Sequence, residues 1–158
     1  MGQNYISVLI ETLEKKRDAL QNILRITKTQ EQIAKGSVYQ EEEMERALNE
    51  KDIQIARINT LDEGFQSVYE RVRAEVQRQP DLYRKDLVHL QDLIRECTDL
   101  GNQIMVLEER NRDRFQSLFA QSKRQYSASK NKANVAQNYF RTMNNTKILD
   151  AYFVDKKQ

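Results

Sequence analysis

The chain is poor in the residues that break helices and form disulfides. Its 158 residues include four glycines, one proline, one cysteine and no tryptophan. So few turn residues argue against an all-β fold with many short connections. Cys97 alone cannot form an internal disulfide. No apolar run approaches the roughly 18 residues of a membrane-spanning helix, and the first residues lack the pattern of a secretory signal. We therefore expect a cytoplasmic protein with no membrane span.

The side chains that carry most enzyme chemistry are also scarce. His89 is the only histidine, and eight residues along the predicted third helix separate it from Cys97. These two side chains form neither a nucleophile pair nor a set of metal ligands, and no glycine-rich phosphate loop is present. We therefore predict no catalytic, metal-binding or cofactor-binding residue, and no enzyme.

What the chain does have is a hydrophobic heptad rhythm, broken once at Pro80. The spacing of about 3.5 residues is typical of long helices packed side by side. Before Pro80 the apolar series is Met44, Leu48, Ile55, Ile58, Phe65, Tyr69, Val72 and Val76, and after it Tyr83, Leu87, Leu90, Ile94, Cys97 and Ile104. Together with 39% hydrophobic and 32% charged residues, this predicts an all-α fold: an elongated antiparallel three-helix bundle.

Breaks in the pattern place the helices near residues 4–35, 40–79 and 82–121. Gly36 is expected to end the first helix in a left-handed conformation, and Pro80 to end the second. The bundle is expected to span residues 1–121, and a partly helical, basic C-terminal tail residues 122–158. The predicted core residues are Ile55, Ile58, Phe65, Leu90, Ile94, Leu100 and Ile104. Gly101 is expected to face inward, where another helix crosses closely.

Several polar residues interrupt the apolar stripes. Lys16 and Thr27 lie on the stripe of the first helix, and Lys51 and Asp62 fill the two missing positions of the second. In the third helix the sequence EERNRDR, residues 108–114, predicts that the core stripe lapses there. The third helix is also expected to outrun the first, which would leave its C-terminal part less covered.

The charge of +2 is unevenly distributed. Residues 120–158 hold eight basic and two acidic residues, a net +6, so the rest of the chain carries −4. This charge is modest and no recognition motif accompanies it, so we expect no nucleic-acid partner. Two uses of the tail stay open: docking on its own bundle, or completing its packing on another protein. The predicted partner-binding residues are Phe115, Leu118, Phe119, Tyr126, Val135, Tyr139, Phe140 and Met143.

Three stretches resemble the FlgN-type flagellar export chaperones, most closely the clostridial members. LNEKDIQIARINTLDEGFQSVY, residues 48–69, is similar to their second helix, through the pairs Glu50-Lys51 and Leu61-Asp62. LIRECTDLGNQIMVLEERNRDRF, residues 93–115, is similar to their third helix. The ending YFVDKK, residues 152–157, resembles an FDxK terminus with Val154 inserted.

The resemblance implies a cytoplasmic chaperone of type III export without enzymatic activity. It would bind the C-terminal helices of the flagellar hook-associated proteins that join hook and filament, using its own C-terminal region. Components of the export apparatus would be further partners. The related FliT-like and FliS-like chaperones rank second. The alternative from another class is a structural coiled-coil protein that self-associates, against which the expected lapse at residues 108–114 argues.

Overall fold

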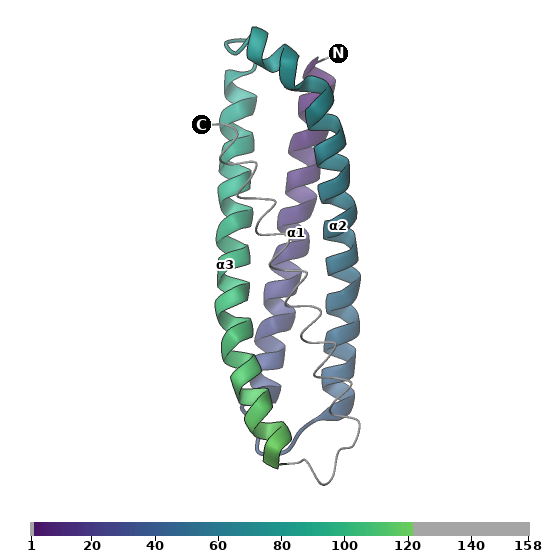
Figure 1. Cartoon of the computed structure of the whole chain (residues 1–158), viewed down its shortest axis with the longest axis vertical. Coiled ribbons are helices and arrows are strands. Elements are labelled where there is room, and N and C mark those ends of the chain that lie inside the picture. The colour runs from purple at the N-terminus through teal and green to yellow at the C-terminus, as the bar shows by residue number, and fades with distance from the viewer. Residues whose placement is uncertain (1, 122–158) are drawn as a thin grey trace.

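A computed structural model of the chain describes residues 2–121, with side-chain exposure given from residue 4. It has three helices, α1 (Gly2–Ala34), α2 (Glu41–Arg78) and α3 (Arg84–Gln121). They run down, up and down along one long axis (Figure 1). The described residues contain no strand. The all-α, antiparallel three-helix prediction is therefore confirmed, and each helix begins and ends within two residues of its expected bounds.

The two connections end the helices in different ways. α2 stops just before Gln79-Pro80, because the residue before a proline disfavours the helical region. The chain then turns through hydrogen bonds from the Leu82 N–H to the Gln79 carbonyl (3.2 Å) and from the Tyr83 N–H to the Pro80 carbonyl (3.3 Å). At the other connection the Gly36 N–H donates to the Ile33 carbonyl at 3.1 Å. No glycine in the described part has a positive φ, so the expected left-handed conformation of Gly36 is wrong.

α1 is the central helix of the bundle. It packs against both α2 and α3, whereas no Cα atom of α2 lies within 8 Å of a Cα atom of α3. Ion pairs join α1 to each neighbour, from Arg25 to Glu50 of α2 (3.8 Å) and from Arg17 to Glu96 of α3 (3.6 Å). α1 is therefore covered on two sides, while α2 and α3 stand apart along the face opposite α1.

The core runs the length of the bundle as three successive clusters. Of the predicted core residues, all but one are buried, namely Ile55, Ile58, Phe65, Leu90, Ile94 and Ile104. Leu100 is only partly buried and packs against the middle cluster. The heptad positions of all three helices therefore point to a common axis, as the 3.5-residue spacing predicts.

The polar interruptions of the stripes are buried and pair with one another between helices. Lys16 of α1 forms an ion pair with Asp62 of α2, with 2.8 Å between Nζ and Oδ1. Nearer the other end, Lys51 Nζ of α2 donates to Oε1 of Gln30 on α1 and to Oε1 of Glu108 on α3. Burial lowers the pKa of the Lys51 amine below its usual value, against the attraction of Glu108, which raises it. These contacts fix which residues of neighbouring helices lie opposite one another along the bundle.

The seam of α3 continues through residues 108–114, where we expected it to lapse. Glu108 and Asn111 occupy its heptad positions and are both buried. The Asn111 side-chain amide donates to the Thr27 carbonyl of α1 at 3.1 Å, and the Thr27 hydroxyl lies 3.3 Å from Glu108 Oε1. Polar side chains therefore continue the packing here because α1 presents polar partners at the same level.

Candidate partner-binding face

The described residues of the predicted binding site lie at the end of the bundle where α3 stops. Phe115 and Leu118 are buried and Phe119 is partly buried, in a cluster with residues of α1, α2 and the α1–α2 connection. Tyr39 of that connection meets Phe115 and Phe119 edge to face, with ring centroids 6.5 and 5.0 Å apart. The expectation that the C-terminal part of α3 is poorly covered is therefore wrong, because Tyr39 covers it.

The other predicted site residues, Tyr126, Val135, Tyr139, Phe140 and Met143, lie outside the described residues. The role of all eight residues in binding a partner stays a prediction. Of the three predicted residues that the structure describes, Phe119 is the one that is partly exposed, and it packs beside a buried cluster.

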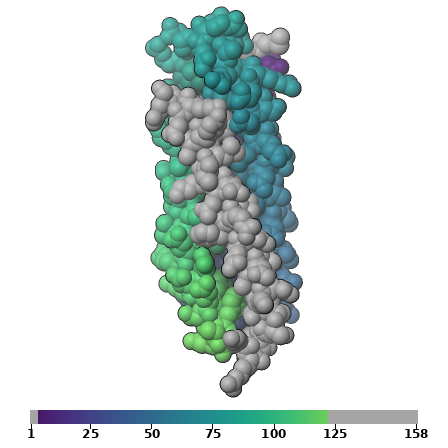
Figure 2. Space-filling view, in the orientation of Figure 1, coloured from purple at the N-terminus to yellow at the C-terminus, as the bar shows by residue number. Residues whose placement is uncertain are grey.

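A second candidate surface lies between α2 and α3, on the side of the bundle away from α1. We call it the α2–α3 face. In the space-filling view, α3 forms one long edge of the molecule and α2 the other (Figure 2). Heptad spacing assigns its residues: Glu45, Asp52, Gln66, Tyr69, Arg73 and Val76 on α2, and Leu87, Gln91, Thr98, Gly101 and Met105 on α3.

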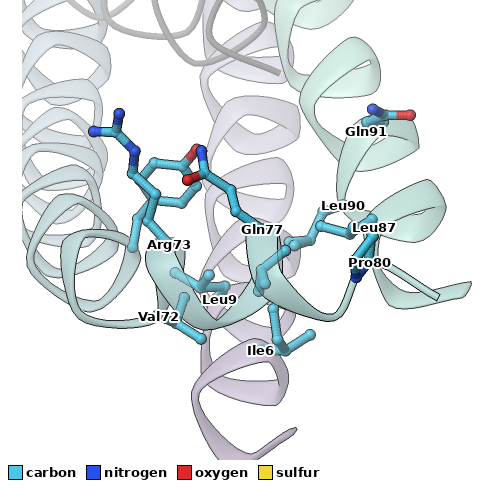
Figure 3. A pocket seen from close by; sticks show the side chains of 11 residues that line it. Ile6, Leu9, Val72, Arg73, Gln77, Pro80, Leu87, Leu90 and Gln91 are labelled. Carbon is cyan, nitrogen blue, oxygen red and sulfur yellow. The ribbon is translucent and has the colours of Figure 1, made fainter. Parts of the chain in front are cut away.

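At the Pro80 end this face is hollowed into an open cavity of about 210 Å³. Ile6 and Leu9 of α1 line it, while side chains of α2 and α3 form its two walls (Figure 3). The apolar lining residues from these helices are Tyr69, Val72, Val76, Leu87 and Leu90, and Arg73, Gln77 and Gln91 add polar groups. The cavity could receive a bulky apolar side chain.

Gly101 shows that space continues along the face. It lies two heptads beyond Leu87 on the same stripe of α3 and is buried. No atom of residues 2–121 lies within 4 Å of a Cβ atom built on Gly101. The close crossing of another described helix that we expected at Gly101 is therefore absent, and the space beside this glycine belongs to the α2–α3 face.

The α2 edge of the face carries opposite charges at its two ends. Glu45 and Asp52 lie toward the start of α2, and Arg73 lies beside the cavity. Partial desolvation raises the pKa of the exposed Asp52 carboxyl, against the attraction of neighbouring Lys51, which lowers it. A helix bound along this edge would therefore be favoured if it carried basic residues at the Glu45 end and acidic residues at the Arg73 end.

No group of histidine, cysteine, aspartate and glutamate side chains within residues 2–121 could hold a metal ion. Within the same span, no helix is both long and apolar enough to cross a membrane. The candidate sites are therefore the end of the bundle where α3 stops and the α2–α3 face, and both are suited to holding another helix.

The sequence predicted the first of these two surfaces, at the end of α3, but not the α2–α3 face. The heptad lists contained Tyr69, Val76 and Leu87, but treated them as ordinary core positions. Their partial exposure depends on how far apart α2 and α3 stand, which the sequence of either helix does not state. Comparison of the chain with models of known protein families, with curated proteins and with solved structures found no match.

Proposed function

We propose that this protein is a non-enzymatic binding protein that holds an amphipathic helix of another protein along its α2–α3 face. The observation that supports the proposal most directly is that α2 and α3 both pack on α1 but not backbone to backbone on each other. A fourth helix laid between them would complete a four-helix arrangement. Its apolar side chains would meet the cavity lined by Leu9, Val76 and Leu87.

The resemblance to FlgN-type chaperones gives the proposal a specific form. In that form the protein is a cytoplasmic chaperone of type III export, and its partner is the C-terminal helical segment of a flagellar hook-associated protein. Phe119 and the tail residues named above would extend the contact beyond the bundle. The resemblance supplies the identity of the partner, and the geometry of the α2–α3 face supports only the kind of segment that is bound.

Calorimetric titration with a C-terminal peptide of a hook-associated protein tests this proposal. Val76 lines the cavity, whereas Val88 is 51% exposed and does not line it. We expect Val76→Arg to weaken binding about fivefold or more, because truncating or blocking a buried anchor typically costs about 1–4 kcal/mol, and every 1.4 kcal/mol corresponds to about tenfold. Val88→Arg is the matched control and should bind like the parent. Equal affinity of all three folded chains would exclude the α2–α3 face as the site.

Self-association is the second candidate, and the structure removes the argument against it. The seam of α3 runs without a lapse through Glu108 and Asn111 to Leu118. Because these residues are buried inside the bundle, a second copy would instead lie along the α2–α3 face. Sedimentation with and without the peptide separates the two functions. A monomer that forms a one-to-one complex supports the binding protein, whereas a dimer that ignores the peptide supports self-association.

A further inference from the structure

The chain itself contains a segment that could occupy the α2–α3 face. Residues 122–158 follow Gln121, the last residue of α3, at the same end of the bundle where α2 begins (Figure 1). A helix rises about 1.5 Å per residue, so these 37 residues could reach roughly 55 Å if helical, close to the length of the 38-residue α2. The segment is long enough to run back along the whole face.

The charges of the segment match those of the face in that direction. The contact between Lys51 and Glu108 fixes which residues of α2 and α3 lie at one level. A segment returning from Gln121 would bring its first eleven residues beside Glu41 and Glu45. Those eleven residues carry four basic side chains and no acidic one, namely Lys123, Arg124, Lys130 and Lys132.

At the Pro80 end of the face the signs are exchanged: the segment is acidic and the face is basic. The only acidic residues of the segment are Asp150 and Asp155. Counted back along the face, they fall near the level of Arg73, beside the cavity. Between the two ends, Val135, Tyr139 and Met143 recur every four residues, so they would share one side of a helix. Tyr139 would lie near the level of Gly101, where the face has open space.

From this length, direction and charge pattern we propose that residues 122–158 dock along the α2–α3 face and compete there with the partner helix. The competition rests on the proposed function, while the docking itself does not. A docked tail would occupy the α2–α3 face until a partner helix of the same charge pattern displaced it. The apparent affinity for the partner would then be lowered by the fraction of chains in which the tail is docked.

A single tryptophan tests the docking in the full chain. The chain has no tryptophan, so Tyr139→Trp introduces a unique fluorescent reporter. We expect its emission to be blue-shifted, as in an apolar site. Gly101→Arg should shift it to the red, because the new side chain would fill the space that the tail occupies. Gly64→Arg is the matched control, since Gly64 is an exposed mid-helix glycine that also has no atom of the described residues within 4 Å of its Cβ position.

Emission like that of free tryptophan in the Tyr139→Trp chain would overturn the docking, and so would equal emission when Gly101→Arg or Gly64→Arg is added to that chain. If Gly101→Arg fails to fold, as judged by circular dichroism, Glu45→Lys with Asp52→Lys replaces it. Both of those residues are exposed, and the reversed charges should release the basic start of the tail. A blue emission unchanged by this reversal would equally overturn the proposal.

The competition has a separate readout. Lys123→Glu with Arg124→Glu should weaken docking and so raise the affinity of the full chain for the hook-associated peptide several-fold. Lys156→Glu with Lys157→Glu changes the same number of charges near Arg73 and should not raise it. If no chain binds the peptide, the proposed function fails while the tryptophan result still decides the docking. If the peptide binds but neither charge reversal changes its affinity, the competition is wrong.

Discussion

At the scale of single residues, the side chains that look out of place in the heptad pattern match one another between helices. Lys16 pairs with Asp62, and Lys51 with Glu108. Buried ion pairs of this kind contribute little net stability, because removing two charges from water offsets most of their attraction. Their effect is instead to make other alignments unfavourable, since sliding α2 or α3 along α1 would leave a buried charge without its partner.

This role predicts an asymmetry between single and double substitutions. Lys51→Met alone should lower the free energy of unfolding by about 3–5 kcal/mol, because Glu108 is then left as a buried charge without its cation. Replacing both, as Lys51→Met with Glu108→Met, should recover most of that loss or exceed the parent stability. Urea denaturation of the parent, Lys51→Met, Glu108→Met and the double variant measures the coupling. A double variant no more stable than the single one would contradict this account.

At the scale of the helices, stability comes from the burial of one stripe on each helix. Ile58 of α2 is 1% exposed in the middle cluster, whereas Ile53 of the same helix is 66% exposed. The same residue type thus occurs inside and outside the core within two turns of one helix. Comparing the same substitution at Ile58 and at Ile53 therefore separates the contribution of packing from that of helix propensity.

We expect Ile58→Ala to lower the free energy of unfolding by about 2–5 kcal/mol, through lost apolar burial and the cavity left behind. Ile53→Ala should change it by less than about 0.5 kcal/mol, as is usual for surface sites. Thermal and urea denaturation monitored by circular dichroism give both values. Should the two variants melt alike, the assignment of the buried stripe would be wrong.

At the scale of the whole molecule, α1 holds the other two helices together. α2 and α3 approach each other through side chains such as Lys51 and Glu108, but their backbones both pack on α1 alone. The outer sides of α2 and α3 face water, while α1 is covered from two directions. Opening α1 therefore requires the loss of both interfaces, whereas α2 or α3 can open with the loss of one.

Amide hydrogen exchange tests this arrangement. We expect the central part of α1, near Leu20 and Ile23, to exchange most slowly, because protection reflects the free energy of the opening that exposes each amide. The corresponding central parts of α2 and α3 should exchange faster. Mass spectrometry of peptides from the full chain supplies the rates. Faster exchange in α1 than in both neighbours would contradict its central position.

The sequence by itself determined the helices, their bounds and most of the core. Few glycines, one proline and a sustained heptad spacing leave little choice of local structure, because each helix can bury only one stripe. The same pattern also placed Lys16, Thr27, Lys51 and Asp62 on buried faces. The heptad pattern could not show that these residues pair. It gives the side of the helix on which a residue lies, but not which residue of a neighbouring helix lies opposite.

The tertiary structure decided what lies between the helices. Glu108 and Asn111 look like a lapse in the stripe of α3, and only the polar groups of α1 and α2 opposite them make the seam continuous. Tyr39 covers Phe115 and Phe119 because the α1–α2 connection folds over the end of α3. The α2–α3 face exists because both helices pack on α1 rather than on each other. That choice depends on the packing of three stripes at once, which no single stretch of sequence contains.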